Sequence, residues 1–163
     1  MNIILIGMPG AGKSTVGVVL AKALGFQFID TDLIIQEREQ ELLHMIIQEK
    51  GMEAFLALEE KAILTLTGDN KVIATGGSVI YKEAGMNHLK KLGIVVYLNT
   101  HYKILEKRIR NMETRGIAMG KNNTLKDIYW ERKALYERYA DLTVTCKGKT
   151  VEKIVKLIKK QLQ

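Results

Sequence analysis

The chain has 163 residues, a length that is typical of one domain and leaves no room for two large ones. Apolar residues make up 47% of it and charged residues 26%, the balance of a globular protein with one well-filled core. No apolar run approaches the roughly 20 residues that a membrane-spanning helix needs, and the net charge of +7 suits anionic ligands.

Short apolar runs alternate with longer segments of helical periodicity along the chain. The predicted strands lack strict alternation, as expected when helices cover both faces of a sheet, and they are Asn2 to Ile6, Gln27 to Ile29, Val72 to Ala74, Ile94 to Leu98 and Leu142 to Thr145. The predicted helices include Lys13 to Leu24, which Gly25 ends, His101 to Met112, and one that Thr124 caps and that runs to about Ala140. This order predicts an α/β fold of parallel strands joined by right-handed crossovers.

Two segments interrupt the alternation. Leu33 to about Thr67 shows helical patterns and no strand, which predicts a helical insertion. Asn111 to Asn123 is rich in Gly, Asn, Lys and Met and has little apolar periodicity, so we expect a mobile loop that acts as a lid.

The end of the chain is basic and amphipathic. Val151, Ile154, Val155, Ile158 and Leu162 recur at helical spacing among several lysines, which predicts a helix whose lysines face solvent. A nucleic-acid-binding surface is the alternative, but no aromatic residues interleave with the lysines.

The single cysteine, Cys146, lies next to the last predicted strand. It is either a buried packing residue or a nucleophile, and free cysteines more commonly pack. One cysteine cannot form an internal disulfide, which fits a reducing compartment, and we expect a cytoplasmic protein.

The sharpest motif runs from Gly7 to Ser14 and fits G-x-x-x-x-G-K-[ST] between a predicted strand and a predicted helix. Gly10 and Gly12 let the backbone curl so that its N–H groups surround phosphate oxygens, and the start of the helix adds its positive dipole. The Lys13 ammonium reaches the β- and γ-phosphates, and the Ser14 hydroxyl is placed to bind Mg²⁺. The motif predicts ATP binding but leaves open whether the protein is a switch, a motor or a kinase.

Two carboxylates follow the second predicted strand. Asp30 and Asp32 lie beyond its carboxyl end, where open parallel sheets bind ligands. A carboxylate there can hold a Mg²⁺-bound water, orient an acceptor hydroxyl or accept its proton, and either aspartate can also cap the helix that starts near Leu33.

Three further features are candidates for the acceptor and lid sides of the site. Gly76 and Gly77 follow the third predicted strand, where they allow a ligand close to the backbone or simply form a tight turn. Arg115 lies in the predicted lid and is either solvated or able to stabilise a transferring phosphoryl group. Arg132 lies on the following helix, where burial would require an anionic partner.

These residues together resemble the shikimate kinase family, P-loop enzymes of the nucleoside-monophosphate-kinase-like group. The likeness covers almost the whole chain, and its most specific elements are Phe28-Ile29-Asp30-Thr31-Asp32 and Ala74-Thr75-Gly76-Gly77. It also includes Glu53-Ala54-Phe55 followed by Glu59, and Arg132 ahead of Leu135-Tyr136. The resemblance implies a single three-layer P-loop kinase domain over 1–163, with a five-stranded parallel sheet flanked by helices, an acceptor-binding insertion at about 33–67 and a lid at about 111–123.

The resemblance also implies roles for particular residues. On the nucleotide side, the implied binding residues are Gly10, Ala11, Gly12, Lys13, Ser14 and Thr15, with Arg108 and Lys149 beside the adenine. Lys13 and Arg115 would stabilise the transferring phosphoryl group, Ser14 would bind Mg²⁺ directly and Asp30 would bind it through water. On the acceptor side, Asp32 would bind ring hydroxyls of shikimate and help to activate the attacking 3-hydroxyl. Gly76 and Gly77 would contact the acceptor, Arg132 would bind its carboxylate, and Glu59 would orient groups on the acceptor side.

The acceptor half departs from the family pattern at several positions. Leu56 stands where the family has an arginine that pairs with the acceptor carboxylate, and Ser78 replaces the third glycine of a Gly-Gly-Gly turn. In the lid, Gly116 and Ile117 replace Pro and Leu. Outside the lid, Ala134 replaces the proline that precedes Leu135-Tyr136 in the family pattern. We therefore expect a divergent acceptor site.

The expected function is that of a shikimate kinase in aromatic amino acid biosynthesis, with Mg²⁺ as cofactor, ATP as co-substrate and a small hydroxylated acid as acceptor. Two alternatives stay open: a small-molecule kinase with another hydroxylated acceptor, and a non-catalytic ATP-binding regulatory protein. We expect a monomer that binds neither nucleic acid nor membranes.

Overall fold

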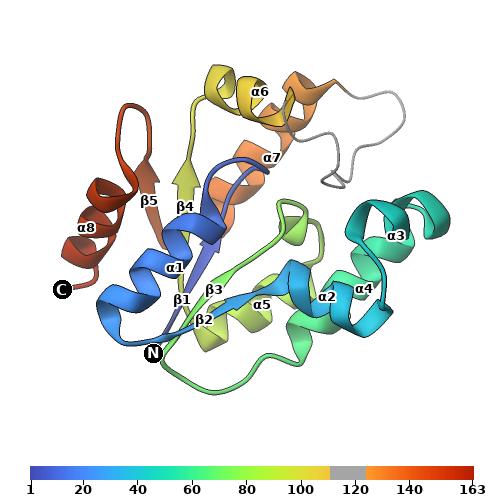
Figure 1. Ribbon diagram of the computed structural model, residues 1–163, viewed down its shortest axis with the longest axis horizontal. Coiled ribbons are helices and arrows are strands. Elements are labelled where there is room, and N and C mark those ends of the chain that lie inside the picture. Colours follow the sequence, from blue (N-terminus) through green and yellow to red (C-terminus); the bar gives the residue numbers. More distant parts are fainter. Residues whose placement is uncertain (111–123) are drawn as a thin grey trace.

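The computed structural model describes residues 1–110 and 124–163 (Figure 1). Its strands are β1 (Asn2–Ile6), β2 (Gln27–Asp30), β3 (Lys71–Ala74), β4 (Gly93–Asn99) and β5 (Leu142–Thr145). Its helices are α1 (Lys13–Leu24), α2 (Thr31–Glu39), α3 (Leu43–Lys50), α4 (Met52–Leu64), the short 3₁₀ helix η1 (Val79–Tyr81), α5 (Glu83–Leu92), α6 (Tyr102–Arg110), α7 (Leu125–Tyr139) and α8 (Val151–Gln161). The predicted strands are all confirmed within two residues, whereas η1 and α5 were not among the predicted elements.

The five strands form one parallel sheet in the order β2-β3-β1-β4-β5. The central strand β1 is completely buried, with Ile3, Ile4, Leu5 and Ile6 each 0% exposed. The chain moves from β1 to one edge for β2 and later crosses to the other side for β4, so ligands are expected beyond the carboxyl end of β1.

Helices cover both faces of this sheet, which confirms the three-layer architecture (Figure 1). On one face, Gly17 of α1 approaches Leu5 and Phe28 so closely that an added Cβ would lie 2.6 Å from the Phe28 ring. On the other face, Tyr136 of α7 stacks on Tyr97 of β4 with ring centroids 5.1 Å apart. None of the helices in the described residues is long and apolar enough to cross a membrane.

The segment predicted as a helical insertion contains α3, α4 and most of α2. These helices bury a separate apolar cluster made of Ile35, Ile46, Phe55, Leu56 and Ala62. Ile34 and Tyr81 pack against both this cluster and the sheet core, and Ile63 of α4 belongs to the sheet core, so α4 is held from both sides.

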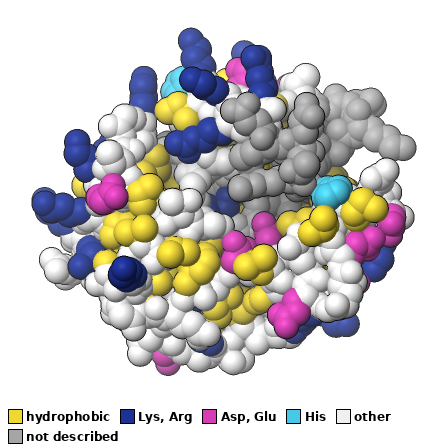
Figure 2. Space-filling model, viewed as in Figure 1, with side chains coloured by type: hydrophobic (Ala, Val, Ile, Leu, Met, Phe, Trp, Pro, Cys, Tyr) yellow, Lys and Arg dark blue, Asp and Glu magenta, His cyan; other side chains and the backbone are white. Residues whose placement is uncertain are grey.

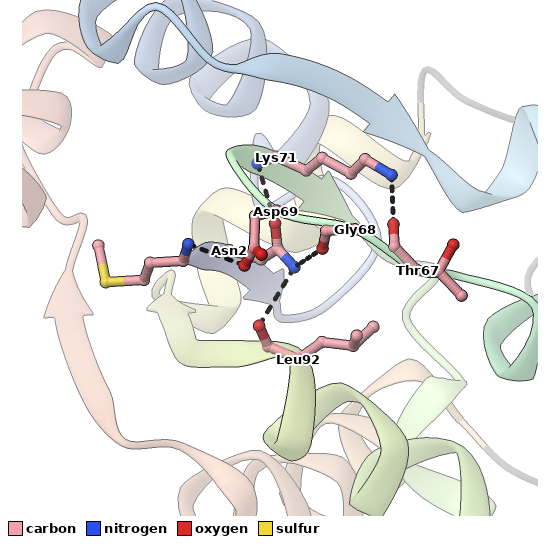
Figure 3. Close-up of polar contacts among 7 residues, drawn as sticks. Asn2, Thr67, Gly68, Asp69, Lys71 and Leu92 are labelled. Carbon is pink, nitrogen blue, oxygen red and sulfur yellow. Dashed lines mark hydrogen bonds and ion pairs between the residues drawn. The ribbon is translucent and has the colours of Figure 1, made fainter.

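At the amino end of β1, the buried side chain of Asn2 (1% exposed) connects three segments of the chain (Figure 3). Its side-chain amide donates to the carbonyls of Gly68 at 2.7 Å and Leu92 at 3.1 Å, and its Oδ1 accepts from the backbone N–H of Lys71 at 3.0 Å. One side chain thereby ties β1 to the segments that lead into β3 and β4.

The helix α8 confirms the amphipathic prediction for the basic tail. Ile154, Val155 and Ile158 are buried in the core, and Lys153, Lys156 and Lys160 are exposed. Figure 2 shows lysine and arginine side chains gathered at the margin of the molecule where α6 and α8 lie. Cys146 is also buried, and burial raises the pKa of its thiol, which supports the packing interpretation over the nucleophile.

Candidate active site

The P-loop connects the carboxyl end of β1 to the start of α1. Gly10 and Gly12 have φ values of 81° and 91°, in the left-handed region that favours glycine. Their conformation curls the loop over the first turn of α1, where unpaired backbone N–H groups and the helix dipole favour an anion. Ser14 and Thr15, which follow in α1, are both exposed.

The Lys13 side chain folds back into this loop. It is 8% exposed, and its ammonium donates to the carbonyls of Gly7 at 2.7 Å and Met8 at 2.8 Å. Burial lowers the pKa of Lys13 to about 8, and the Asp32 carboxylate acts in the opposite direction. The ammonium therefore lies between the phosphate loop and the carboxylates that follow β2.

Asp30 makes two distinct contacts at the end of β2. Its Oδ1 accepts from the backbone N–H of Asp32 at 3.0 Å and caps α2, as one of the pair was expected to do. Its Oδ2 accepts from the Ser14 hydroxyl at 2.8 Å.

The Ser14 and Asp30 oxygens suit Mg²⁺, which prefers oxygen ligands and commonly uses one or two protein groups together with substrate phosphates. Within residues 1–110 and 124–163, no group of three or more His, Cys, Asp or Glu side chains could hold a metal ion without such help. The oxygen pair thus fits an ion that arrives with a nucleotide.

Acidic side chains from two helices converge on Gly76, just after β3. A Cβ at this position would lie 2.5 Å from Oε2 of Glu59 and 2.9 Å from Oδ1 of Asp32. Any larger residue at this position would have to displace both carboxyl groups. Glu59 is 2% exposed on α4, and its Oε1 accepts from the Ser78 hydroxyl at 2.9 Å.

Arg132 is 1% exposed and lies on the acceptor side of the same turn. Its Nε donates to the Tyr81 hydroxyl at 3.2 Å, and its guanidinium carbon lies 5.3 Å from the centre of the Tyr81 ring. The Tyr136 hydroxyl donates to the Gly77 carbonyl at 2.5 Å. A Cβ on Gly77 would lie 2.6 Å from Cδ of Pro9 and 3.1 Å from Nη1 of Arg132, so the P-loop and the acceptor-side turn are in contact.

Two basic residues flank the outer side of the P-loop. Arg108 of α6 donates from Nη1 to the Gly10 carbonyl at 2.8 Å. Lys149 closes the turn after β5, where its N–H donates to the Cys146 carbonyl at 3.1 Å. Arg108 and Lys149 both lower the pKa of the Cys146 thiol, so each of these cations lies within electrostatic range of that residue.

The structure thus brings most of the predicted site residues to the carboxyl edge of the sheet. Arg115 lies outside the described residues, as do the predicted lid and its Gly116 and Ile117 differences. Leu56 is 4% exposed and belongs to the apolar cluster of the insertion.

Sequence reasoning missed Tyr81, Tyr136 and the contact between Ser78 and Glu59. The sequence signal for Ser78 was that a polar residue stands where the family pattern has a third glycine.

The comparisons with known proteins agree on one family and cover almost the whole chain. A family model described as shikimate kinase matches residues 9–163. The shikimate kinase of Paracidovorax citrulli is 37% identical over 100% of this chain and 92% of that protein. Human threonine synthase-like 1 is 36% identical over 98% of this chain but only 22% of its own length. The structure of the Acinetobacter baumannii shikimate kinase in complex with shikimate superposes with a TM-score of 0.91 and 31% identity, covering 99% of this chain and 92% of the other.

Proposed function

This chain belongs to the shikimate kinase family, a family of ATP-dependent kinases, and from that premise we propose that it transfers the γ-phosphate of ATP to the 3-hydroxyl of shikimate. One observation supports the proposal most strongly. The P-loop lysine, two carboxyl groups and a buried arginine meet around Gly76 and Gly77, where Pro9 and Gly77 lie within contact distance. A phosphate donor and a hydroxylated acid would therefore bind side by side.

On the donor side, the P-loop amides from Gly10 to Thr15 bind the phosphates of ATP. Lys13 exchanges its bonds to the Gly7 and Met8 carbonyls for phosphate oxygens and neutralises charge on the transferring group. Arg108 and Lys149 line the adenine side, and Arg115 completes the charge stabilisation.

On the acceptor side, Asp32 binds the attacking hydroxyl and accepts its proton as the new O–P bond forms and the bond between the γ-phosphorus and the ADP oxygen breaks. Arg132 binds the carboxylate of the acceptor, and the Tyr81 hydroxyl and ring hold the guanidinium in place. Glu59, Gly76 and Gly77 complete this side of the site.

Ser14 and Asp30 would hold Mg²⁺, directly and through water respectively. When bound there, the ion would supply positive charge that offsets the negative charge of the transferring phosphate. The distance of 2.8 Å between the Ser14 and Asp30 oxygens supports this assignment, because it brings two oxygen ligands together at the start of α1.

A kinase with a different hydroxylated acceptor is the second candidate. The observation in its favour is Leu56, whose apolar side chain is buried in the cluster of the insertion and offers no charge to an acceptor carboxylate. Arg132 is then the main cation on the acceptor side, and an acceptor that needs a second cation would bind weakly.

A coupled ADP-release assay with and without shikimate tests the proposal. We expect shikimate-dependent ADP release and a phosphorus NMR signal of a phosphate ester. ADP release with another polyol or hydroxy acid only would favour the second candidate. ATP binding without turnover on any acceptor would show a non-catalytic protein.

We further propose that the protein works in the cytoplasm as a monomer, without nucleic acid or membrane partners. The buried free thiol of Cys146 supports a reducing compartment. The lysines of α8 serve as the solvated face of a helix whose apolar side is buried in the core.

A further inference from the structure

Glu59 has an unusual environment for an acidic residue. It is 2% exposed, and its Oε1 accepts a hydrogen bond from the Ser78 hydroxyl at 2.9 Å. Oε2 is buried and has no hydrogen-bond partner in the described part of the chain. A buried oxygen without a partner is costly, so its presence beside the other acceptor-side residues indicates a group that a ligand satisfies.

The position of Oε2 indicates which chemical group of a ligand would bond to it. An added Cβ on Gly76 would lie 2.5 Å from Oε2 and 2.9 Å from Oδ1 of Asp32, so the two oxygens border the same small space. Asp32 is the residue that we assign to the attacking hydroxyl. A polyhydroxylated acceptor held by Asp32 would therefore present a neighbouring hydroxyl to Glu59.

We propose that Ser78 is a positioning residue for the acceptor: its hydroxyl holds Oε1 of Glu59 and directs Oε2 toward a second hydroxyl group of the bound acid. This inference rests on the proposed function and adds to it the requirement for two hydroxyl groups on the acceptor. Asp32 takes one of them, Glu59 takes the other, and Arg132 takes the carboxylate.

The protonation state of Glu59 determines how Oε2 bonds. Burial raises the pKa of Glu59 to about 8, the Ser78 hydrogen bond lowers it, and Asp32 raises it. The other charged groups that face Glu59 are Arg132 of α7 and Lys13 of α1, which both lower it. Near pH 7 the carboxyl group is therefore protonated, Oε1 accepts from Ser78, and Oε2 donates its proton to the acceptor hydroxyl.

Above pH 8 Glu59 becomes an anion beside Asp32 and opposite an anionic acceptor. The Michaelis constant for shikimate should then rise. Because the Ser78 hydroxyl stabilises the carboxylate form, removal of this hydroxyl should move the rise to higher pH.

The test measures the Michaelis constants for shikimate and ATP from pH 6 to 9.5 in the wild type, Ser78→Ala, Ser78→Gly and Ser78→Thr, with Mg²⁺-ATP saturating when shikimate is varied. We expect the shikimate constant to rise about 2- to 10-fold at pH 7 in Ser78→Ala and Ser78→Gly, the effect of one hydrogen bond. The ATP constant should not change, the pH inflection should move upward, and Ser78→Thr should restore much of the loss. Two different small residues at position 78 guard against a folding defect in one of them.

Thr75→Val is a matched control, because it removes another buried hydroxyl of the same turn, one that donates to the Leu5 carbonyl at 2.9 Å. It should lower thermal stability without moving the pH inflection. A shikimate constant and inflection in Ser78→Ala and Ser78→Gly that match the wild type would overturn the inference. An equal shift of the inflection in Thr75→Val would also overturn it.

Failure of the proposed function would be seen in the wild type instead. The unmodified protein would then show no shikimate-dependent ADP release at any pH, and the inference about acceptor binding would fall with it.

Discussion

The Ser14 hydroxyl donates a hydrogen bond to Oδ2 of Asp30 at 2.8 Å, which links the first turn of α1 to the end of β2. The other carboxyl oxygen of Asp30 caps α2. A single carboxylate thus fixes the start of one helix and leaves its second oxygen beside the phosphate loop.

Asp30→Asn should weaken Mg²⁺ binding, and so raise the Mg²⁺ concentration that activity requires, while the fold is retained. Asparagine caps helices as well as aspartate does, so only the negative charge near the ion is lost. We expect a higher Mg²⁺ concentration for half-maximal activity and an unchanged melting temperature. Asp30→Ala is the matched comparison, because it also loses the cap and should cost about 1 kcal/mol of stability. An Asp30→Asn enzyme with the wild-type Mg²⁺ requirement would remove Asp30 from the metal site.

Asp32→Asn should lose about 10²- to 10⁴-fold in kcat, the contribution expected of a general base. The residues that we propose to bind the nucleotide do not include Asp32, so calorimetry should show ATP affinity close to that of the wild type. Retained turnover in this variant would exclude Asp32 from proton transfer.

Gly77→Ala should weaken the binding of both substrates, ATP and shikimate. Its Cβ would lie 2.6 Å from Pro9 Cδ and 3.1 Å from Arg132 Nη1, so the P-loop and the acceptor-side arginine must both move. We expect higher Michaelis constants for ATP and shikimate.

Gly85→Ala is the matched control for this substitution. Its Cβ meets side chains of α4 at 3.6 Å or more, and alanine in a helix interior should add about 0.5–1 kcal/mol of stability without a change in kinetics. Unchanged kinetics in Gly77→Ala would show that the two halves of the site are not in contact.

Glu59→Gln should gain stability over the wild type as the pH rises. The pKa of Glu59 is raised from 4.5 to about 8 in the folded protein, so between these values the native state binds more protons than the unfolded chain. The free energy of unfolding of the wild type therefore falls through this window, by at most about 1.4 kcal/mol per pH unit from this residue.

Glutamine does not titrate, so the difference in unfolding free energy between Glu59→Gln and the wild type should grow from pH 5 to pH 8 and stay constant above it. Urea unfolding at four pH values measures the difference. A difference that is independent of pH would mean that Glu59 titrates normally.

Leu56→Arg should lower the Michaelis constant for shikimate. A charged hydrogen bond to a carboxylate contributes about 1.5–3 kcal/mol, or roughly 10- to 150-fold in affinity. Leu56 is buried beside Phe55 and Ile46, so the variant should also lose stability, and the melting temperature must be measured in parallel. A folded variant with unchanged shikimate kinetics would contradict the role assigned to position 56.

The strands of the sheet could be predicted because each one is specified by the residues within it and next to it. Each buried strand is a short apolar run, and the P-loop marks the junction of β1 and α1. The helix α5 was not predicted because Gly85 and Asn87 lower its intrinsic propensity, and its formation depends on packing of Met86 and Leu89 against the core. The start of α2 was placed two residues late because the cap at Asp30 also belongs to the end of β2.

The positions of the site residues were predictable where one strand end supplies them, as for Asp30 and Asp32. The contacts among them were not, because they join segments that are far apart in the sequence. Ser78 and Glu59 are separated by 19 residues, and Arg132 and Tyr81 by 51. Only tertiary packing shows that Ser78, noted as a departure from the family pattern, holds the carboxyl group of Glu59.

The contact of Pro9 with Gly77 restricts how this scaffold can diversify. A Cβ at position 77 would lie 2.6 Å from Pro9 Cδ, so a side chain cannot be added to the acceptor-side turn at this point without displacing the donor loop. A substitution on α4, which carries Leu56 and Glu59, would therefore be the less disruptive way to alter acceptor preference.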